Sequence, residues 1–318
     1  MYDHIRERGI SFEKEHHKFW IERKVSDYNP HRTLQHEISQ YLEPSQTTYR
    51  ILDVGCGPIS TLGTTYEGKS IELIGIDPLT QYYQELLSQY DIHLTFEPIQ
   101  GEGERLLDYF APNSFDLVYS RNALDHSHDP YEAIKAMLTV CKPKSYVVFS
   151  VFKNEGLNSG YVGFHQWNFT PVDQSLLIWS MSKAHLLDEC INGLPYKISE
   201  QTVHNKEMLT CTIYKCDTSP SCMSEIHHGL YLNIDKKANS ICLFKEDSFS
   251  CSERFFVHLK NKNSIQHKFS FIWNLEIPMK SFFLPEVSYD EIFIGQYAMI
   301  KENESHSHTR FWGKSIHV

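Results

Sequence analysis

Positive charge is in short supply in this sequence. Its 318 residues contain 30 Lys and Arg against 40 Asp and Glu, a formal net charge of −10. Proteins that bind the phosphate backbone of nucleic acid do so largely through Lys and Arg, so this balance argues against a nucleic-acid partner. The 41% share of hydrophobic residues still allows a globular protein with a large core, in one large domain or two unequal ones.

Long hydrophobic runs are missing as well. No stretch approaches the roughly 18 uncharged apolar residues that a membrane-spanning helix requires. The first residues, Met-Tyr-Asp-His-Ile-Arg-Glu-Arg, contain no apolar core of the kind found in secretory signal peptides. We therefore expect no membrane span and a cytoplasmic location.

The cysteines form no C-x-x-C pair, although the chain has eight of them, at positions 56, 141, 190, 211, 216, 222, 242 and 251. In a cytoplasmic protein they are expected to be reduced thiols. A zinc site from Cys211, Cys216, Cys222, His227 and His228 is not expected, because gaps of four and five residues fit no standard zinc spacing. The sequence predicts no metal site.

The most informative stretch is residues 50–58, Arg-Ile-Leu-Asp-Val-Gly-Cys-Gly-Pro. The apolar residues before Gly55 predict a buried strand, and Gly55 and Gly57 predict a turn where backbone passes close to a ligand. A carboxylate at Asp53 would repel a pyrophosphate but suits a cationic ligand such as S-adenosylmethionine, which carries a sulfonium and an ammonium. A dinucleotide loop, G-x-G-x-x-G, would need glycine where Ser60 stands.

From residue 50 onward, strands and helices alternate, which is typical of a parallel sheet with helices on both faces. Strands are predicted at 50–54, 71–76, 92–99, 115–120, 145–152, 196–203 and 208–216, with helices at 79–90, 130–141 and near 172–189. The predicted fold is α/β: a doubly wound, mostly parallel seven-stranded sheet with an N-terminal helical cap at 1–45. The cap holds a helix over 4–28 and a second one that Pro30 opens and that ends near Pro44.

A change of pattern follows Asp217-Thr-Ser-Pro-Ser, which reads as a linker or a sharp turn. Residues 228–300 show short alternating apolar runs without helical periodicity. We predict a domain over residues 1–217 and a β-rich accessory region over 218–318, whose polar tail at 303–318 is expected to be loosely ordered.

Three further motifs follow in order. Asp77 ends a predicted strand 24 positions after Asp53, where its carboxylate can accept both hydroxyls of a ribose or cap the helix opened by Pro78. Gln100-Gly-Glu-Gly-Glu-Arg-Leu follows the third strand, and Asn-Ser-Phe-Asp-Leu-Val-Tyr-Ser-Arg-Asn-Ala-Leu-Asp-His-Ser-His-Asp-Pro occupies 113–130.

Together, these four motifs resemble the class I S-adenosylmethionine-dependent methyltransferases over about residues 30–217. The chain departs from their acidic-x-Gly-x-Gly-x-Gly pattern at Ile59, which stands at the third glycine. The resemblance implies S-adenosylmethionine as cofactor, with Asp77 on the ribose and Glu102 and Gly103 at the adenine, although a slip to Glu104 stays open. The implied cofactor-binding set is Asp53, Gly55, Gly57, Asp77, Pro78, Glu102, Gly103, Ser120 and Arg121.

The resemblance also places Asn122, Asp125 and His126 near the transferred methyl group. A histidine with a pKa near neutrality suits a general base for an alcohol acceptor, although a histidine here can equally close the turn before the next helix. His165 is a second candidate base, in the loop 154–171 after the fifth strand. In the same loop Gln166 and Trp167 are candidate acceptor-binding residues, unless Trp167 only anchors the loop.

The sequence thus predicts a methyltransferase that methylates a hydroxyl of a small or carbohydrate-like acceptor, as in glycan or small-molecule biosynthesis. Two alternatives stay open. N-methylation of an amino sugar or a related amine would need a carboxylate to orient the amine, and a cofactor-binding scaffold would need no catalytic group. The acceptor, the role of residues 218–318 and the oligomeric state are not determined by the sequence.

Overall fold

The computed structural model describes residues 2–25, 28–173, 175–191 and 193–217, and beyond them the strands between Ser224 and His317. The chain divides into two compact units, one of residues 1–191 with 196–217 and one of residues 192–195 with 218–318. Each unit is described by itself. Independent folding of residues 1–217 remains a prediction.

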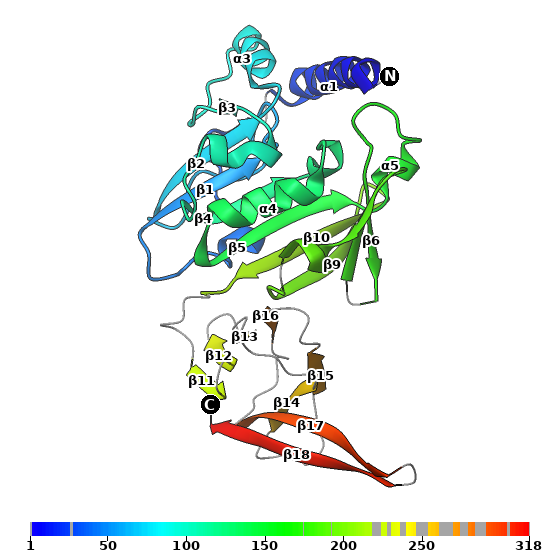
Figure 1. The fold of residues 1–318 in the computed structure, drawn as a ribbon. Helices are drawn as coiled ribbons and strands as arrows, with labels where there is room; N and C mark the ends of the chain where they lie inside the picture. Colours follow the sequence, from blue (N-terminus) through cyan, green and yellow to red (C-terminus); the bar gives the residue numbers. More distant parts are fainter. Residues whose placement is uncertain are drawn as a thin grey trace. The chain divides into compact units, whose positions relative to one another are not determined.

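The first unit is built on a seven-stranded sheet (Figure 1). Its strand order is β3-β2-β1-β4-β5-β10-β9; the pairs from β3 to β5 are parallel, and β10 is antiparallel to both of its neighbours. The predicted fold class is confirmed. The strands are β1 Thr48–Val54, β2 Ser70–Asp77, β3 Ile99–Gln100, β4 Phe115–Arg121, β5 Cys141–Phe152, β9 Tyr196–Val203 and β10 Lys206–Lys215.

Chain segments cover the sheet on both sides because successive strand residues point to opposite faces. Tyr49 and Ile51 of β1 pack with Leu34 and Ile38 from the segment before β1, whereas Val54 points to the face where α4 contacts β4 and β5. The helices are α1 Tyr2–Lys24, α2 His36–Ser39, α3 Thr80–Gln89, α4 Pro130–Val140, α5 Glu155–Asn158 and α6 Leu187–Ile191, with short 3₁₀ turns η2 Gly103–Asp108 and η3 Leu124–His126.

The order of the strands fixes where a ligand can bind. From β1 the chain proceeds outward to β2 and β3, then returns to the other side of β1 for β4 and β5. The loops that leave β1 and β4 therefore diverge from neighbouring strands, and a crevice forms at the carboxyl ends of these strands. Figure 1 shows α1, in dark blue, near this end of the sheet.

The prediction of a helix near residues 172–189 is wrong. This segment forms most of a three-stranded antiparallel sheet of β6 Asn168–Val172, β7 Ser175–Trp179 and β8 Ala184–Leu186. Leu176 and Ile178 are buried while their neighbours in β7 are half-buried, which is the two-residue period of a strand. Asp173, at a φ of 53°, lies in the turn that reverses the chain between β6 and β7.

Two other predicted elements are much shorter than expected. The predicted strand 92–99 is reduced to the two residues of β3, directly after Pro98, whose ring nitrogen cannot donate to a ladder. The helix expected to begin at Pro30 is limited to α2, because the chain before it pairs with a distant segment: Thr33 forms a parallel bridge with Thr65, and the Leu34 amide donates to the Thr65 carbonyl at 2.7 Å. Tertiary pairing overrides the local helix signal here.

The second unit contains two four-stranded antiparallel sheets in the part that the structure describes. One has the order β11-β12-β13-β16, with β11 Ser224–His227, β12 Leu230–Asp235, β13 Ser240–Lys245 and β16 Met279–Phe283; the other has the order β15-β14-β17-β18, with β14 Arg254–Lys260, β15 Ser270–Trp273, β17 Glu291–Asn303 and β18 His306–His317. The expectation of a loosely ordered tail is wrong for 306–317, since β18 pairs along β17.

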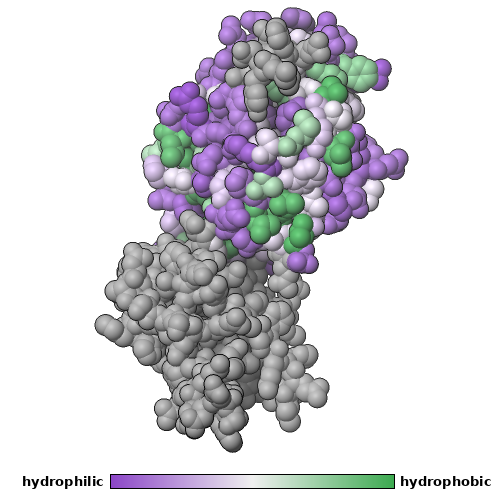
Figure 2. All heavy atoms as spheres, turned by 45° about the vertical axis from the view of Figure 1, so that its right-hand side comes forward, coloured by the Kyte–Doolittle hydropathy of each residue, from purple (hydrophilic) through white to green (hydrophobic). Residues whose placement is uncertain are grey.

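On the face drawn in Figure 2, hydrophilic residues surround separate small groups of hydrophobic ones. Among the described residues, no helix is both long enough and apolar enough to cross a membrane.

Candidate active site

A cleft of about 1290 Å³ opens at the carboxyl edge of the sheet. It brings together most of the residues predicted from sequence, although they come from separate loops. Predicted residues that line it are Gly55, Gly57, Asp77, Pro78, Glu102, Gly103, Ser120, Arg121, Asn122, His126, His165, Gln166 and Trp167. Asp53 and Asp125 are buried behind the walls of the cleft, with 2% and 0% of their surface exposed.

The loop after β1 allows a ligand to approach its backbone closely. Gly55 and Gly57 have φ angles of 71° and 62°, a region that glycine adopts without strain. A Cβ atom on Gly55 would also lie 2.3 Å from the Cβ of Ala123, so a larger residue would not fit. Ile59, at the position of the third glycine, lines the cleft and packs with the apolar cluster around Leu86.

Asp77 holds this loop from the end of β2. Its Oδ2 accepts a hydrogen bond from the Gly57 amide at 3.0 Å, and its Oδ1 accepts one from the Leu79 amide at 2.8 Å. Burial raises the pKa of Asp77, and these two hydrogen bonds oppose that effect without cancelling it. The carboxylate therefore shapes the glycine loop as well as facing the cleft, and contact with a ribose remains a prediction.

We expect the Asp77→Ala variant to bind S-adenosylhomocysteine about 10- to 100-fold more weakly than wild type, since a charge-assisted hydrogen bond contributes about 1.5–3 kcal/mol. Calorimetric titration would measure this. Asp77→Asn keeps the shape of the side chain, so its affinity for S-adenosylhomocysteine should lie between those of wild type and Asp77→Ala. The matched control is Asp91→Ala, which removes a highly exposed carboxylate. Equal affinity in wild type and Asp77→Ala would rule out the ribose contact.

Asp53 has a different environment from the one expected of a ligand-facing carboxylate. Its Oδ2 accepts a hydrogen bond from the Ser60 hydroxyl at 2.5 Å, and the Ser60 oxygen in turn accepts one from the Leu62 amide at 3.0 Å. Burial raises the pKa of Asp53 to about 7; the Ser60 hydrogen bond opposes the rise and the charge of Asp77 adds to it. Asp53 thus stabilises the loop after β1 from its buried side.

The adenine and methionine ends of the predicted cofactor site also have suitable groups. Glu102 and Glu104 both line the cleft. Glu102 lies 3.6 Å from His128, whereas the Glu104 carboxylate accepts a hydrogen bond from the Asp129 amide at 3.0 Å and so is already engaged at the start of α4. This arrangement favours Glu102 over the alternative at Glu104. Ser120 Oγ and Asn122 Oδ1 are buried without hydrogen-bond partners among the described residues, so polar capacity is left for a bound cofactor.

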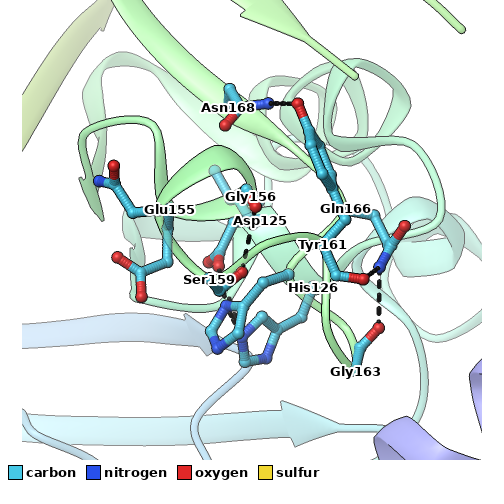
Figure 3. Close-up of polar contacts among 12 residues, drawn as sticks. Asp125, His126, Glu155, Gly156, Ser159, Tyr161, Gly163, Gln166 and Asn168 are labelled. Atoms are coloured by element: carbon cyan, nitrogen blue, oxygen red, sulfur yellow. Dashed lines mark hydrogen bonds and ion pairs between the residues drawn. The ribbon is translucent and has the colours of Figure 1, made fainter. Parts of the chain in front are cut away.

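Two histidines and a buried aspartate meet at the other end of the cleft, and Figure 3 labels Asp125 and His126 of this group. The Nδ1 atom of His165 lies 2.7 Å from Asp125 Oδ2 and 2.9 Å from Nε2 of His126. Burial raises the pKa of Asp125, but the two histidines outweigh it and the net shift is downward. For His165 the directions are reversed. Burial alone would lower its pKa, but the hydrogen bond and the charge of Asp125 outweigh burial, and the pKa of His165 is raised. Asp125 therefore orients His165.

The loop that carries His165 is held by its own polar side chains. The Gln166 amide nitrogen lies 2.9 Å from both the Tyr161 and the Gly163 carbonyl oxygens, to which it donates. Asn168 donates to the Tyr161 hydroxyl at 3.2 Å and accepts from the Leu157 amide at 2.7 Å, as Figure 3 shows in part. Only 4% of the Trp167 surface is exposed, which fits the anchoring interpretation better than stacking against an acceptor. The acceptor-binding roles of Gln166 and Trp167 stay predictions.

Sequence reasoning identified none of the α1 residues that line the cleft. Gly9, Glu13, His17 and Ile21 recur every four residues and form the buried or half-buried side of this helix. Glu13 and His17 line the cleft, Glu13 Oε1 lies 3.8 Å from Nδ1 of His126, and the His17 and Tyr83 ring centroids are 5.0 Å apart. The Glu13–His17 spacing is visible in the sequence, but hydrophobic periodicity does not detect a face built from polar residues.

The parallel sheet with its reversal at β1, the two-glycine loop and the acidic end of β2 define a domain of the Rossmann-like, nucleoside-cofactor type. Residues 52–149 match the family model described as a methyltransferase domain. The chain carries a class I S-adenosylmethionine-dependent methyltransferase domain, and S-adenosylmethionine is its cofactor.

Individual relatives are similar over part of the chain. An uncharacterized methyltransferase of Schizosaccharomyces pombe is 31% identical over 135 residues, which cover 40% of this chain and 48% of that protein. A ubiquinone biosynthesis O-methyltransferase of Paraburkholderia phymatum is 30% identical over 112 residues, covering 33% of this chain and 44% of that protein. The chain thus spans about half the length of these two relatives.

Among solved structures, the chain is similar to an S-adenosylmethionine-dependent methyltransferase of Methanosarcina mazei. The TM-score is 0.37 at 16% identity, and the similarity covers 58% of this chain and 100% of that one.

Proposed function

We propose that this protein transfers the methyl group of S-adenosylmethionine to a hydroxyl group of a small or carbohydrate-like acceptor. The observation that carries the proposal is the cluster of His126, His165 and Asp125, whose two imidazoles line the cleft next to the loop that follows β4. The names of the ubiquinone biosynthesis O-methyltransferases among the similar proteins support oxygen as the methylated atom.

The chemistry explains why such a cluster matters. When bound, S-adenosylmethionine supplies a methyl carbon that its sulfonium already activates. The protein then mainly has to orient the acceptor oxygen in line with the carbon–sulfur bond and exclude water. A hydroxyl is a poor nucleophile until it loses its proton, and His126 and His165 are the proposed groups that promote this loss. Asp125 positions His165, and Phe164, beside His126, offers apolar surface for the acceptor.

A competing proposal is methylation of an amine such as an amino sugar. The observation that favours it is Glu13, a carboxylate in the wall of the cleft that could orient an ammonium group before it loses its proton. Glu155 adds negative charge nearby, although its Oε1 is paired with Lys206 at 2.7 Å.

The experiment that tests the proposal is methyl transfer to paired acceptors. The protein is incubated with methyl-labelled S-adenosylmethionine and matched sugars or phenols that differ only in bearing a hydroxyl or an amine. Mass spectrometry identifies the methylated atom. We expect label on oxygen. Label only on nitrogen would favour the competing proposal, and cofactor binding without label in any acceptor of a broad panel would favour a scaffold.

A further inference from the structure

The cluster at the acceptor end of the cleft has a composition that general base catalysis does not require. Glu13, His126 and His165 each place a ligand atom within 4.8 Å of the others, although they come from α1, from η3 and from the loop after α5. Two imidazoles with a carboxylate are the donor set that divalent transition-metal ions prefer. Since the sequence predicted no metal site, this convergence is a finding of the structure.

The hydrogen bonds of the cluster meet at one nitrogen, Nδ1 of His165. His165 Nδ1 can carry a single hydrogen, and Asp125 Oδ2 at 2.7 Å is the stronger acceptor for it because it is charged. His126 Nε2 lies 2.9 Å from the same nitrogen and 3.4 Å from the same oxygen. When Nδ1 of His165 donates to Asp125, the other ring nitrogen of His165 carries a lone pair that can bind a cation.

The surroundings of the two histidines are also rich in negative charge. Asp125 is fully buried, and its Oδ1 has no hydrogen-bond partner among the described residues. Glu13, 7% exposed, lies 3.8 Å from His126, and its charge also acts on His165. Two buried carboxylates beside one another, Asp125 and Glu13, are costly unless a positive charge compensates them.

We propose that Glu13, His126 and His165 bind a divalent transition-metal ion of the zinc or manganese type, with Asp125 as the carboxylate that fixes the His165 ring. A hydrogen bond from the second ring nitrogen of a ligating histidine to a carboxylate is the usual support of such sites. Mg²⁺ prefers oxygen ligands alone and should bind poorly.

This inference rests on the proposed function and gives it a mechanism. Three protein ligands leave a coordination position that faces the cleft for the acceptor oxygen. The coordinated hydroxyl loses its proton to water because the ion lowers its pKa. The oxygen then forms a bond to the methyl carbon, and the electron pair of the broken carbon–sulfur bond stays on sulfur. The products are the methyl ether, S-adenosylhomocysteine and one proton.

The test is calorimetric titration of the full chain, first dialysed against a chelator, with ZnCl₂ and separately with MgCl₂. We expect one tight Zn²⁺ site, weak Mg²⁺ binding, and at least about 10-fold weaker Zn²⁺ binding in Glu13→Gln, His126→Ala and His165→Ala. His93→Ala is the control, since this exposed histidine lies outside the cluster. Unchanged binding of S-adenosylhomocysteine would verify that each variant is folded.

Two outcomes separate this inference from the function on which it rests. Zn²⁺ binding equal to wild type in all three variants, or O-methylation at an undiminished rate in excess chelator, would overturn the metal site and leave the imidazoles to act on the hydroxyl directly. Zn²⁺ binding that the variants weaken, with no hydroxyl acceptor ever methylated, would overturn O-methylation and leave the metal site in place.

Discussion

Replacing His165 with alanine is expected to lower turnover on the true acceptor by roughly 10²–10⁴ while the affinity for S-adenosylhomocysteine stays nearly unchanged. His165 is the better placed of the two histidines because buried Asp125 holds its ring at 2.7 Å. Its removal takes away the group that activates the hydroxyl, whether the imidazole acts directly or through a bound ion. The glycine loop and Asp77, on other strands, are untouched by the change.

Steady-state kinetics with the methylated product as readout, together with calorimetry of S-adenosylhomocysteine, would check this result. Asp125→Asn should reduce turnover less than His165→Ala, because it weakens the orientation of the ring without removing it. His93→Ala provides the matched loss of an exposed imidazole. Near-normal turnover in both His126→Ala and His165→Ala would exclude a chemical role for the cluster, and positioning alone or an amine nucleophile would become the better account.

Replacing Asp53 with asparagine is expected to flatten the pH dependence of stability between about pH 4 and pH 7. The folded-state pKa of Asp53 is about 7, against 3.8 as its ordinary value. The native state therefore binds this proton more tightly than the unfolded state, and its stabilising effect is complete below about pH 4 and is lost as the pH rises through 7. A shift of about three pKa units corresponds to a difference on the order of 4 kcal/mol.

Chemical denaturation of wild type and Asp53→Asn across this pH range would measure the difference between the two curves. The difference isolates Asp53, since Asp77, whose pKa is also raised, contributes to both curves. Asparagine can still accept the hydrogen bond from Ser60, so the loop after β1 should keep its shape. Parallel curves for the two proteins would mean that Asp53 is ionised at neutral pH in the folded state.

The parallel part of the sheet was predictable because each strand carries its own local evidence. β1 and β4 are nearly continuous buried runs, as expected for strands covered on both faces, and each ends in a motif with fixed spacing. The segment after residue 168 was misread because Leu176, Leu177, Met181 and Ala184 fit a helical period by chance. Met181 is 77% exposed, so it does not belong to a buried helical face.

The acceptor end of the site was only partly predictable. His126 and His165 were identified from their places after strands, but the hydrogen bond of His165 to Asp125 spans 40 residues and depends on tertiary structure. Glu13 was not identified, since it lies far from every cofactor motif in sequence. The anchoring of Gln166 through Tyr161 and Gly163 likewise depends on how one loop folds back on itself.

Helix α1 contacts both ends of the cleft, and the helical geometry fixes the distance between the two contacts. Gly9 lies against Phe164 at the acceptor end, where a Cβ atom would come within 2.8 Å of the ring, and His17 lies beside Gly57 at the cofactor end. These two contacts are eight residues apart, which is about 12 Å of helix, with Glu13 midway between them. One inserted residue would turn everything beyond it by about 100°, so α1 could then engage the acceptor or the cofactor but not both. We therefore expect substitutions on the exposed side of α1 to be tolerated better than an insertion or deletion between Gly9 and His17.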